Sequence, residues 1–351
     1  MNCKKMNVPI IIINWNGIED TIECISSLKN MVYDEYHIYL IDNGSQNQEG
    51  QKLELLYSND SKITVIQNNH NYGFTKAHID IWENEIQKQS YKYIVLLNND
   101  TVVDANWLQH LISFAEIQKI DVVSSKMIDF YKRDLMDNAG HQMLNTGEII
   151  PIGFSKSIDL YNNPIENIGA CAGACLYRTS MLHKIGFFDP YFTTGYEDAE
   201  FGLRATISGY KSMFNPKAIV YHKRGQSIKK VFDQDYSIMI QTSILYSYFK
   251  LVPFSNIILS TPSIIFKNLS IVIVDILFFR WHYLYIWYRS WINIFSNVSF
   301  IKQKRDDFYQ ENDYKIGTYQ FSRLLKYFLY FDIKRFWNTI ILKRGTALDN
   351  Y

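Results

Sequence analysis

The chain has 351 residues, of which 47% are hydrophobic and 20% charged, and this balance excludes an intrinsically disordered protein. Its net charge of +1 divides unevenly, because residues 1–228 carry about −6 and residues 229–351 about +7. The basic residues of the second part alternate with long apolar runs. We therefore expect a membrane surface as its partner and no nucleic acid.

The first part alternates between short β-rich runs and longer runs of helical period. Strands are expected at residues 8–14, 37–42, 63–67 and 91–97, with helices near 18–30, 47–58, 74–88 and 104–118. This alternation with short connections predicts right-handed βαβ units and a parallel sheet. In such a sheet, ligands bind beyond the carboxyl ends of the strands.

After residue 120 the alternation weakens. Shorter strands are expected at 121–131, 140–149, 168–177, 210–214 and 218–222, with a helix near 197–208. Gly, Ser and Lys residues interrupt the pattern near 225–232. We therefore divide the chain into a domain of residues 1–228 and a helical region of residues 229–351.

Two segments of the helical region are strongly apolar. Residues 269–295 could span a bilayer by length, but Asp275, Arg280 and Arg289 interrupt them. Because each charge near a bilayer centre costs roughly 2.5–3.5 kcal/mol, we expect an interfacial helix or a helical hairpin. Apolar spacing also predicts an amphipathic helix over residues 321–331. The alternative is that both segments only cover the first domain as core helices.

The cysteines and the N-terminus bear on the compartment. The chain has four cysteines, which are too few and too scattered for a disulfide framework and favour a reducing compartment. We expect Cys171 and Cys175 to be core residues. The apolar run at residues 8–13 is too short for a signal peptide, so we expect a chain that is not exported.

Polar clusters follow the first four expected strands. They are Asn14-Trp15-Asn16-Gly17, Asp42-Asn43-Gly44-Ser45, Asn71-Tyr72-Gly73-Phe74 and Asn98-Asn99-Asp100-Thr101. A carboxylate before Gly-Ser at a strand end can bind a base or a ribose, although the same residues also form an ordinary turn. Asp100 follows a very apolar strand, where an unpaired carboxylate is costly. Its natural partner is Mg²⁺ or Mn²⁺ with a substrate diphosphate, and its alternative role is to cap the next helix.

Titratable residues also lie later in the chain. Glu197, Glu200 and Arg204 share one face of the expected helix, and Asp198 lies in its exposed first turn. Crowded carboxylates can raise one pKa and produce a usable base, whereas the alternative is a solvated helix cap. His222 ends an expected strand, and a lone histidine in such a place is more often structural than a ligand.

These motifs together resemble a known family. The succession NWNG, DNGS, NYGF, LLNNDT, GACAGACLYR, GFFDPYF, EDAEFGLR, GY and YHKRGQS is similar to glycosyltransferase family 2, especially its bacterial rhamnosyltransferase-like branch. The resemblance covers about residues 8–228, and the order of the motifs makes it specific. It implies an α/β GT-A fold, which is Rossmann-like with a mostly parallel sheet flanked by helices. The helical region would then serve membrane or acceptor association, or oligomerisation.

The resemblance implies a role for each cluster. Asp42 would bind uracil or thymine, and the residues that line the nucleotide site would be Asn14, Trp15, Asn16, Asn71, Gly73 and Asn98. Asp100 and His222 would bind a divalent metal ion, Mn²⁺ or Mg²⁺. Asn98 stands where the family usually has the first Asp of its metal motif.

Catalysis would fall to the later carboxylates. Asp198 matches the general base of the family, and Glu197 and Glu200 would bind or orient the acceptor. After the His222 motif the branch often has a Tyr-Tyr…Arg-Asn pattern, whereas here Asp235-Tyr236 precedes Gln241-Thr242. We therefore assign no acceptor residue in that region.

The function implied is inverting transfer of a sugar from a dTDP- or UDP-linked donor, with dTDP-rhamnose as the leading expectation. The acceptor would be a glycan or lipid-linked glycan in cell-surface polysaccharide synthesis. The enzyme would lie in the cytoplasm as a peripheral protein on the inner face of the cell membrane, and whether it forms a homo-oligomer stays open.

Two other interpretations compete with this one. A nucleotide-dependent oxidoreductase or epimerase would need Gly-X-Gly-X-X-Gly after the first strand, and the sequence has none there. A catalytically inactive scaffold or partner subunit would not need Asp42, Asp100, Asp198 and His222 together.

Overall fold

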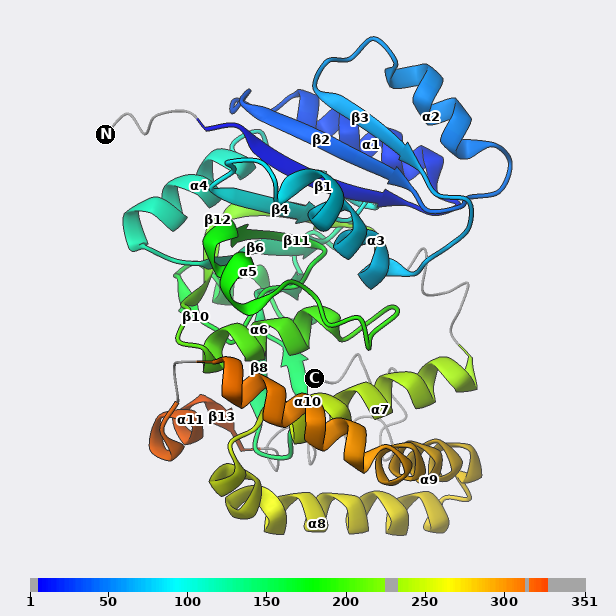
Figure 1. Cartoon of the computed structure of the whole chain (residues 1–351), viewed down its shortest axis with the longest axis vertical. Coiled ribbons are helices and arrows are strands. Elements are labelled where there is room, and N and C mark those ends of the chain that lie inside the picture. Colours follow the sequence, from blue (N-terminus) through cyan, green and yellow to red (C-terminus); the bar gives the residue numbers. More distant parts are fainter. Residues whose placement is uncertain (1–5, 225–232, 313–315, 328–351) are drawn as a thin grey trace. The chain divides into compact units, whose positions relative to one another are not determined.

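The computed structural model describes residues 6–224, 233–312 and 316–327 (Figure 1). The chain divides into two compact units. The second unit takes the chain after residue 230 together with two short segments from earlier in the sequence, residues 142–150 and 207–209. The sequence pattern gives no sign of those two inserted segments.

A mixed sheet forms the middle layer of the first unit. Its main path is β10-β12-β6-β11-β4-β1-β2-β3, while β5 pairs with β12 and β7 with β6. The bounds are β1 Val8–Asn14, β2 Tyr36–Asp42, β3 Ile63–Gln67, β4 Tyr93–Leu97, β5 Thr101–Val103, β6 Val122–Asp129, β7 Met136–Asn138, β10 Ile165–Glu166, β11 Ala174–Arg178 and β12 Ser212–His222. The expected parallel pairing of β1 with β2 and β4, and of β2 with β3, is confirmed. β11 is antiparallel to both of its neighbours.

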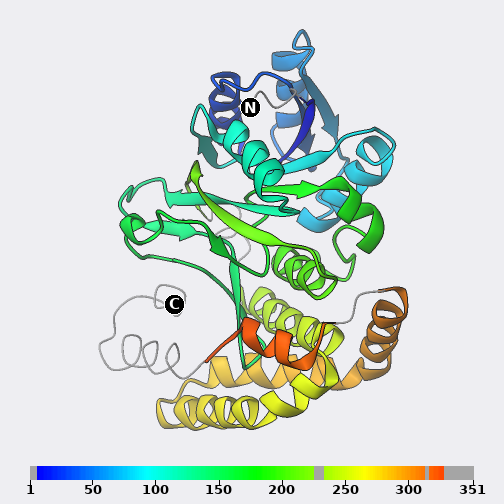
Figure 2. The same cartoon turned by 90° about the vertical axis from the view of Figure 1, so that its left-hand side faces the viewer.

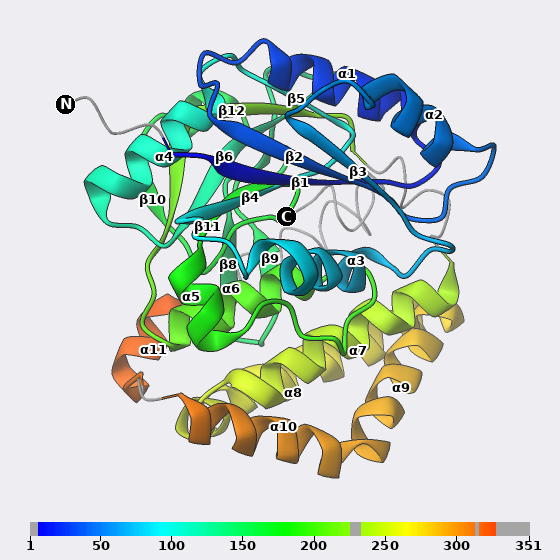
Figure 3. The ribbon, with the colours of Figure 1, turned by 45° about the horizontal axis from the view of Figure 1, so that its top comes forward.

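Helices cover both faces of this sheet (Figure 3). One face packs against α1 Ile18–Lys29, α2 Glu49–Tyr57 and α4 Trp107–Gln118. The other packs against α3 Phe74–Ile81, α5 Thr179–Ile185 and α6 Glu197–Ile207. Strands with helices on both faces are apolar at every position, which is why Ile10, Ile11 and Ile12 are all fully buried.

Several expected elements differ in extent. The helix expected over residues 74–88 is α3 followed by a π-helical turn, Trp82–Ile86. The strand expected at 168–177 begins only at Ala174, and residues 168–173 form a connecting segment. The two strands expected at 210–222 are the single strand β12, with an irregularity between Phe214 and Ile219. The sequence did not predict α5, β5, β7, β10 or the 3₁₀ turn Ile158–Leu160.

The second unit is mainly helical (Figure 2). Its helices are α7 Gln234–Leu251, α8 Phe254–Leu277, α9 Trp281–Ser296, α10 Val298–Glu311 and α11 Thr318–Leu324. A small sheet contains β13 Leu325–Lys326, β8 His141–Leu144 and β9 Ile149–Pro151 in the order β13-β8-β9. Arg305 donates to the carbonyls of Phe249 and Val252 at 2.9 and 2.7 Å, which fastens α10 to the end of α7.

The apolar stretch at residues 269–295 is split between α8 and α9, which are joined by Phe278–Arg280. The amphipathic helix expected over 321–331 is wrong for its middle part. α11 ends at Leu324, because Leu325 and Lys326 pair with β8 as a strand. Residues 328–331 lie outside the described part of the chain.

Candidate active site

The ends of β1 and β2 carry a buried hydrogen-bond network. Asn14 lies opposite Asp42 in the parallel register, and its side-chain amide donates to Asp42 Oδ1 at 2.7 Å. The same amide donates to Glu49 Oε2 at 3.0 Å, and the Thr21 hydroxyl donates to Asn14 Oδ1 at 2.7 Å. Asn14 and Asp42 are therefore brought together as expected. Asn14 acts as the bridge that fixes the carboxylate of Asp42.

The first two polar clusters also bind each other through their loops. Asn16 has a left-handed backbone, with φ 53°, and its Oδ1 accepts from the backbone N–H of Gln46 at 2.7 Å. In return, Asn16 N–H donates to the Ser45 hydroxyl at 2.9 Å. Trp15, which stands between Asn14 and Asn16 in the sequence, is half-buried. The two loops form one continuous rim at the carboxyl ends of β1 and β2.

Asn43 organises the third cluster and was not singled out from the sequence. Its side-chain N–H₂ donates to Asn71 Oδ1 at 2.9 Å and to the Gly73 carbonyl at 3.2 Å, and its Oδ1 accepts from Tyr72 N–H at 3.2 Å. Gly44 permits this approach, because it has φ +70° and a Cβ there would lie 2.4 Å from the Cα of His70. Asn71 and Gly73 thus join the rim formed by the first two clusters.

Asp100 and His222 meet at the other end of the site. Asp100 lies in the turn between β4 and β5, and β5 pairs with β12 so that Thr101 is opposite His222. This places His222 Nε2 3.2 Å from Asp100 Oδ1. The alternative that Asp100 caps a helix is wrong, since the next element is a strand. Burial would lower the pKa of His222, but the charges of Asp100 and Asp137 outweigh it and raise the pKa to about 10.

The pair fits a divalent cation. His222 Nδ1 donates to Asp137 Oδ2 at 2.6 Å, which leaves Nε2 facing Asp100 Oδ1 at 3.2 Å. Without a metal, a proton on Nε2 joins His222 to Asp100, and a divalent cation that displaces this proton would bind the same two atoms. Adjacent ligands of one ion with bonds of about 2.1 Å stand roughly 3 Å apart, close to this separation. No group of three or more His, Cys, Asp or Glu side chains in the described residues could hold a metal. Substrate oxygens would have to complete the shell.

Asp198 is held against the strand end that carries Asp100. Its Oδ2 accepts from the backbone N–H of Ala172 at 2.9 Å, and the next residue, Gly173, accepts from Asn98 N–H at 2.9 Å through its carbonyl. The loop of residues 171–173 therefore links the two motifs. Asp198 is half-buried rather than exposed, which corrects the expectation for the first turn of α6. Sequence pattern could not show that this loop passes beside the turn.

The neighbouring carboxylates are buried. Glu197 is 5% exposed, and burial followed by the charge of Asp198 raises the pKa of its carboxyl to about 8. Glu200 is fully buried, and Arg204 donates to it at 3.0 Å and to the Ile185 carbonyl at 2.6 Å. The carboxyl with the raised pKa is therefore Glu197. Glu200 has no exposed surface for an acceptor, so of its two expected roles only the orienting one stays as a prediction.

Comparison with known proteins gives the family. Residues 10–186 match the model of glycosyl transferase family 2. The chain belongs to this family. An uncharacterized glycosyltransferase of Haemophilus influenzae is 24% identical over 238 residues, which cover 67% of this chain and 70% of that protein. The poly-β-1,6-N-acetyl-D-glucosamine synthase of Staphylococcus epidermidis is 23% identical over 59% of this chain, and the match spans about half, 47%, of that protein.

The fold of this family 2 glycosyltransferase is also that of solved GT-A proteins. The crystal structure of GalNAc-T7 with UDP, GalNAc and Mn²⁺ superposes with a TM-score of 0.51 and 16% identity. The match covers 62% of this chain and 44% of GalNAc-T7. At that identity the likeness shows the fold, and it confirms the α/β GT-A class expected from the motifs.

Two further site residues of this family 2 glycosyltransferase escaped the sequence analysis. Asp137 contacts His222 and also accepts from Arg224 Nε. No local pattern could have found Asp137, because it precedes His222 by 85 residues. Arg224 lies within the motif that contains His222, but nothing in that motif names its partner.

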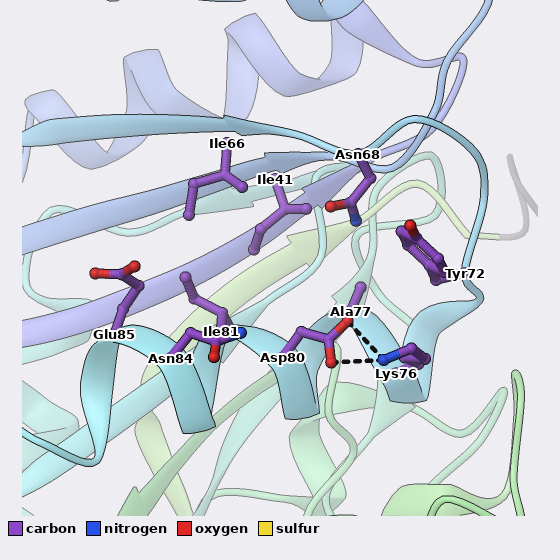
Figure 4. A pocket seen from close by; sticks show the side chains of 10 residues that line it. All are labelled: Ile41, Ile66, Asn68, Tyr72, Lys76, Ala77, Asp80, Ile81, Asn84 and Glu85. Atoms are coloured by element: carbon purple, nitrogen blue, oxygen red, sulfur yellow. Dashed lines mark hydrogen bonds and ion pairs between the residues drawn. The ribbon is translucent and has the colours of Figure 1, made fainter.

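A cavity of about 280 Å³ opens between β2, β3 and α3 (Figure 4). Asn68, Tyr72 and Lys76 line one end of it, and Lys76 forms an ion pair with Asp80 at 2.7 Å. None of the expected site residues lines this cavity. Two of its lining residues, Asn68 and Tyr72, donate to Asn43 Oδ1, and we assign the cavity no role.

Proposed function

We propose that the protein is a metal-dependent, inverting glycosyltransferase that moves a sugar from a nucleoside diphosphate to a hydroxyl of a glycan acceptor. The observation that carries this proposal is the loop of residues 171–173. It binds Asp198 through Ala172 and binds the strand end next to Asp100 through Gly173. A candidate base and a candidate metal site are thereby held together on one short segment.

Asp198 is the residue suited to activate the acceptor. A sugar hydroxyl has a pKa far above seven, so a carboxylate must take its proton as the oxygen attacks the anomeric carbon. Glu200 is fully buried and bound to Arg204, and Glu197 is protonated at neutral pH because its pKa is about 8. The backbone N–H groups of Ala172 and Ala199 fix Asp198 at 2.9 and 2.7 Å. Asp198 is then oriented for the transfer.

Asp100 and His222 would hold the metal ion beside the donor diphosphate. A bound divalent cation would neutralise the charge that develops on the leaving diphosphate. The acceptor oxygen forms its bond to the anomeric carbon as the bond to the phosphate oxygen breaks, and the acceptor proton passes to Asp198. Attack opposite the leaving group inverts the anomeric configuration, and no protein nucleophile takes part.

The rim formed by the first three clusters would bind the nucleotide. Asp42 is held by Asn14, and Asn43 ties the loop of Asn71 and Gly73 to the same place. We propose a uracil or thymine nucleotide there, with Trp15, Asn16 and Asn98 at the margins and dTDP-rhamnose as the first donor to examine. The choice of rhamnose rests on the resemblance of the ordered motifs to the rhamnosyltransferase-like branch. A cell-surface polysaccharide as product is supported by relatives named poly-β-1,6-N-acetyl-D-glucosamine synthase and O-antigen biosynthesis protein RfbC.

We further propose that the second unit holds the enzyme on the cytoplasmic side of a membrane. Among the described residues α8 is the one helix long and apolar enough to cross a bilayer, and 11% of its most apolar window is buried. The distribution of side chains on α8 is the reverse of that on a surface helix of a soluble protein. Asn256 and Lys267 are buried, whereas Phe266 and Leu269 are more than half exposed. Apolar side chains on the outside favour lipid as the neighbour.

Contacts within the second unit favour a helix that lies along the membrane. Lys267, near the middle of α8, is paired with Glu148 of the segment between β8 and β9. Crossing the bilayer would carry this ion pair and its strand segment into hydrocarbon, where irregular backbone is costly. Asn268 accepts from the indole N–H groups of Trp287 and Trp291 at 2.6 and 3.1 Å, which fixes α9 against α8. We therefore propose a peripheral attachment beside a lipid-linked acceptor.

Stereochemistry tests the proposed reaction. The protein is incubated with Mn²⁺, UDP- and dTDP-sugars and a synthetic lipid-linked glycan, and the product is examined by NMR. We expect an anomeric configuration opposite to that of the donor. A product that retains the configuration would contradict single displacement. Donor binding without transfer or hydrolysis, with metal present or absent, would favour the alternative of an inactive scaffold at the membrane.

A further inference from the structure

Asp137 is a buried carboxylate that contacts His222 on the side of the imidazole opposite to Asp100. It is the third member of the series Asp100–His222–Asp137–Arg224, in which each side chain contacts the next. Asp137 is 7% exposed, and its Oδ2 lies 2.6 Å from His222 Nδ1 while its Oδ1 accepts from Arg224 Nε. Because Asp137 binds Nδ1 of His222, only Nε2 of the imidazole is left to face the metal site.

Both oxygens of Asp137 are already bound. Arg224 Nε donates to Oδ1, and Oδ2 lies 2.6 Å from His222 Nδ1. A carboxylate oxygen in this position accepts a hydrogen bond, so His222 carries a proton on Nδ1. Nε2 is then the nitrogen left for a cation, and it lies 3.2 Å from Asp100 Oδ1.

We propose that Asp137 is a positioning residue, which orients His222 and fixes its tautomer so that Nε2 can bind the cation with Asp100. Arg224 completes the device, because it holds the second oxygen of Asp137 and so prevents the carboxylate from rotating away. The inference rests on the proposed function, in that it takes Asp100 and His222 as metal ligands. Partners of this kind typically contribute about 10–100-fold to metal affinity.

The alternative is that Asp137 only contributes an ion pair to the fold. The two roles differ in one measurement, the affinity of the folded protein for Mn²⁺. An ion pair with no link to the metal would change the melting temperature and leave that affinity unchanged. A positioning residue would change the affinity at temperatures where the variant is fully folded.

The test uses Mn²⁺ and UDP as probes with the full chain, and free Mn²⁺ is measured by electron paramagnetic resonance. We expect Asp137→Ala to weaken Mn²⁺ binding by about 10–100-fold. Asp137→Asn keeps an oxygen that can accept from Nδ1–H, so its loss should be smaller. Asp121→Ala is the matched control, because Asp121 pairs with Arg178 at 2.9 Å elsewhere in the first unit and should leave the affinity unchanged.

The outcomes separate this inference from the proposed function. If the wild-type protein binds no Mn²⁺ with or without UDP, the proposed metal site fails and Asp137 has nothing to position. If the wild type binds Mn²⁺ and Asp137→Ala binds it equally well, the inference alone is overturned. Should Asp137→Ala not fold, Asp137→Asn decides: weaker binding than wild type supports the positioning role, and wild-type affinity overturns it.

Discussion

At the scale of single residues, the contacts of Asp198 separate it from the two glutamates beside it. Asp198 is half-buried and bound to the loop of residues 171–173, whereas Glu197 and Glu200 are buried. We expect Asp198→Asn to keep donor binding nearly intact and to lower turnover at least about 100-fold, the usual scale for loss of a general base. Turnover and donor affinity are measured separately. Asp80→Asn, which alters a half-buried carboxylate paired with Lys76 on α3, is the control. Wild-type turnover in folded Asp198→Asn would remove Asp198 from the mechanism.

Glu197 should give the fold a measurable pH dependence. Its pKa in the folded state is about 8, above the usual value of 4.5 for a glutamate, so between these values the folded state holds a proton that the unfolded chain has released. The free energy of unfolding therefore falls as pH rises through this window, by up to about 1.4 kcal/mol per pH unit. Glu197→Gln lacks this group.

The measurement is the melting temperature of both proteins between pH 5 and pH 8. We expect the melting temperature of Glu197→Gln to rise relative to that of the wild type as pH increases, by roughly 3 °C per pH unit at most. A constant difference across this range would show that Glu197 does not hold its proton in the folded protein.

At the scale of elements, the backbone of α6 crosses close to that of residues 168–169 at Gly202. A Cβ on Gly202 would lie 2.6 Å from the Cα of Gly169 and the carbonyl oxygen of Ile168, and neither atom can move as a flexible side chain would. Overpacking of this kind typically costs about 1–3 kcal/mol. We expect Gly202→Ala to lower the melting temperature by several degrees and to reduce turnover by shifting Asp198.

Gly317→Ala is the matched control for that change. Gly317 also lies at a helix, and an added Cβ there would meet only Gln320, at an ordinary distance of 3.5 Å. We expect the control to leave the melting temperature and turnover near wild type. Equal melting temperatures of Gly202→Ala and wild type would show that α6 can move away from the loop without cost.

The exposed apolar face of α8 leads to a prediction about membrane binding. Liposome flotation should show the full chain bound to anionic vesicles, more weakly to neutral ones, and released in part by high salt because the basic residues contribute electrostatically. Phe266→Lys with Leu269→Lys should reduce flotation. Leu55→Lys with Leu56→Lys is the matched pair, since both leucines are exposed on α2 of the first unit.

Two results of that experiment would contradict a lipid-facing role for α8. One is a wild-type protein that stays in solution with both vesicle types at low salt. The other is equal flotation of the α8 variant and its α2 control. A single species of twice the chain mass in solution, lost in the α8 variant, would instead identify the apolar face as a contact between copies of the chain.

Sequence patterns predicted elements well where hydrophobic periodicity alone determines the type of element. The short β-rich runs that became β1, β2 and β3 alternate with longer runs of helical period, and their bounds agree with the expected ones within a residue. The pattern failed where tertiary contacts override periodicity. Leu325 and Lys326 have helical spacing but pair with β8. Residues 168–173, which are rich in Gly and Ala and were expected as part of a strand, cross Gly202 as a connecting segment.

The candidate site shows the same division at the scale of the whole molecule. Residues at strand ends, such as Asn14, Asp42 and Asp100, were predictable because parallel strands bring their carboxyl ends together. Asp137 and Arg224 were not, because their contact is set by how β7 and β12 lie beside β6, far apart in the sequence. The half-buried state of Asp198 likewise depends on a loop from another part of the chain.

Release of nucleoside diphosphate from nucleotide sugars tests the central claim most directly. The full chain is given UDP- and dTDP-linked sugars with the lipid-linked acceptor, in Mn²⁺ and in EDTA, and the diphosphate is quantified. The account predicts release from at least one donor in Mn²⁺, little release in EDTA, and a loss of about 100-fold or more in Asp198→Asn. Equal release in Mn²⁺ and EDTA, or none from any donor that the protein binds, would contradict it.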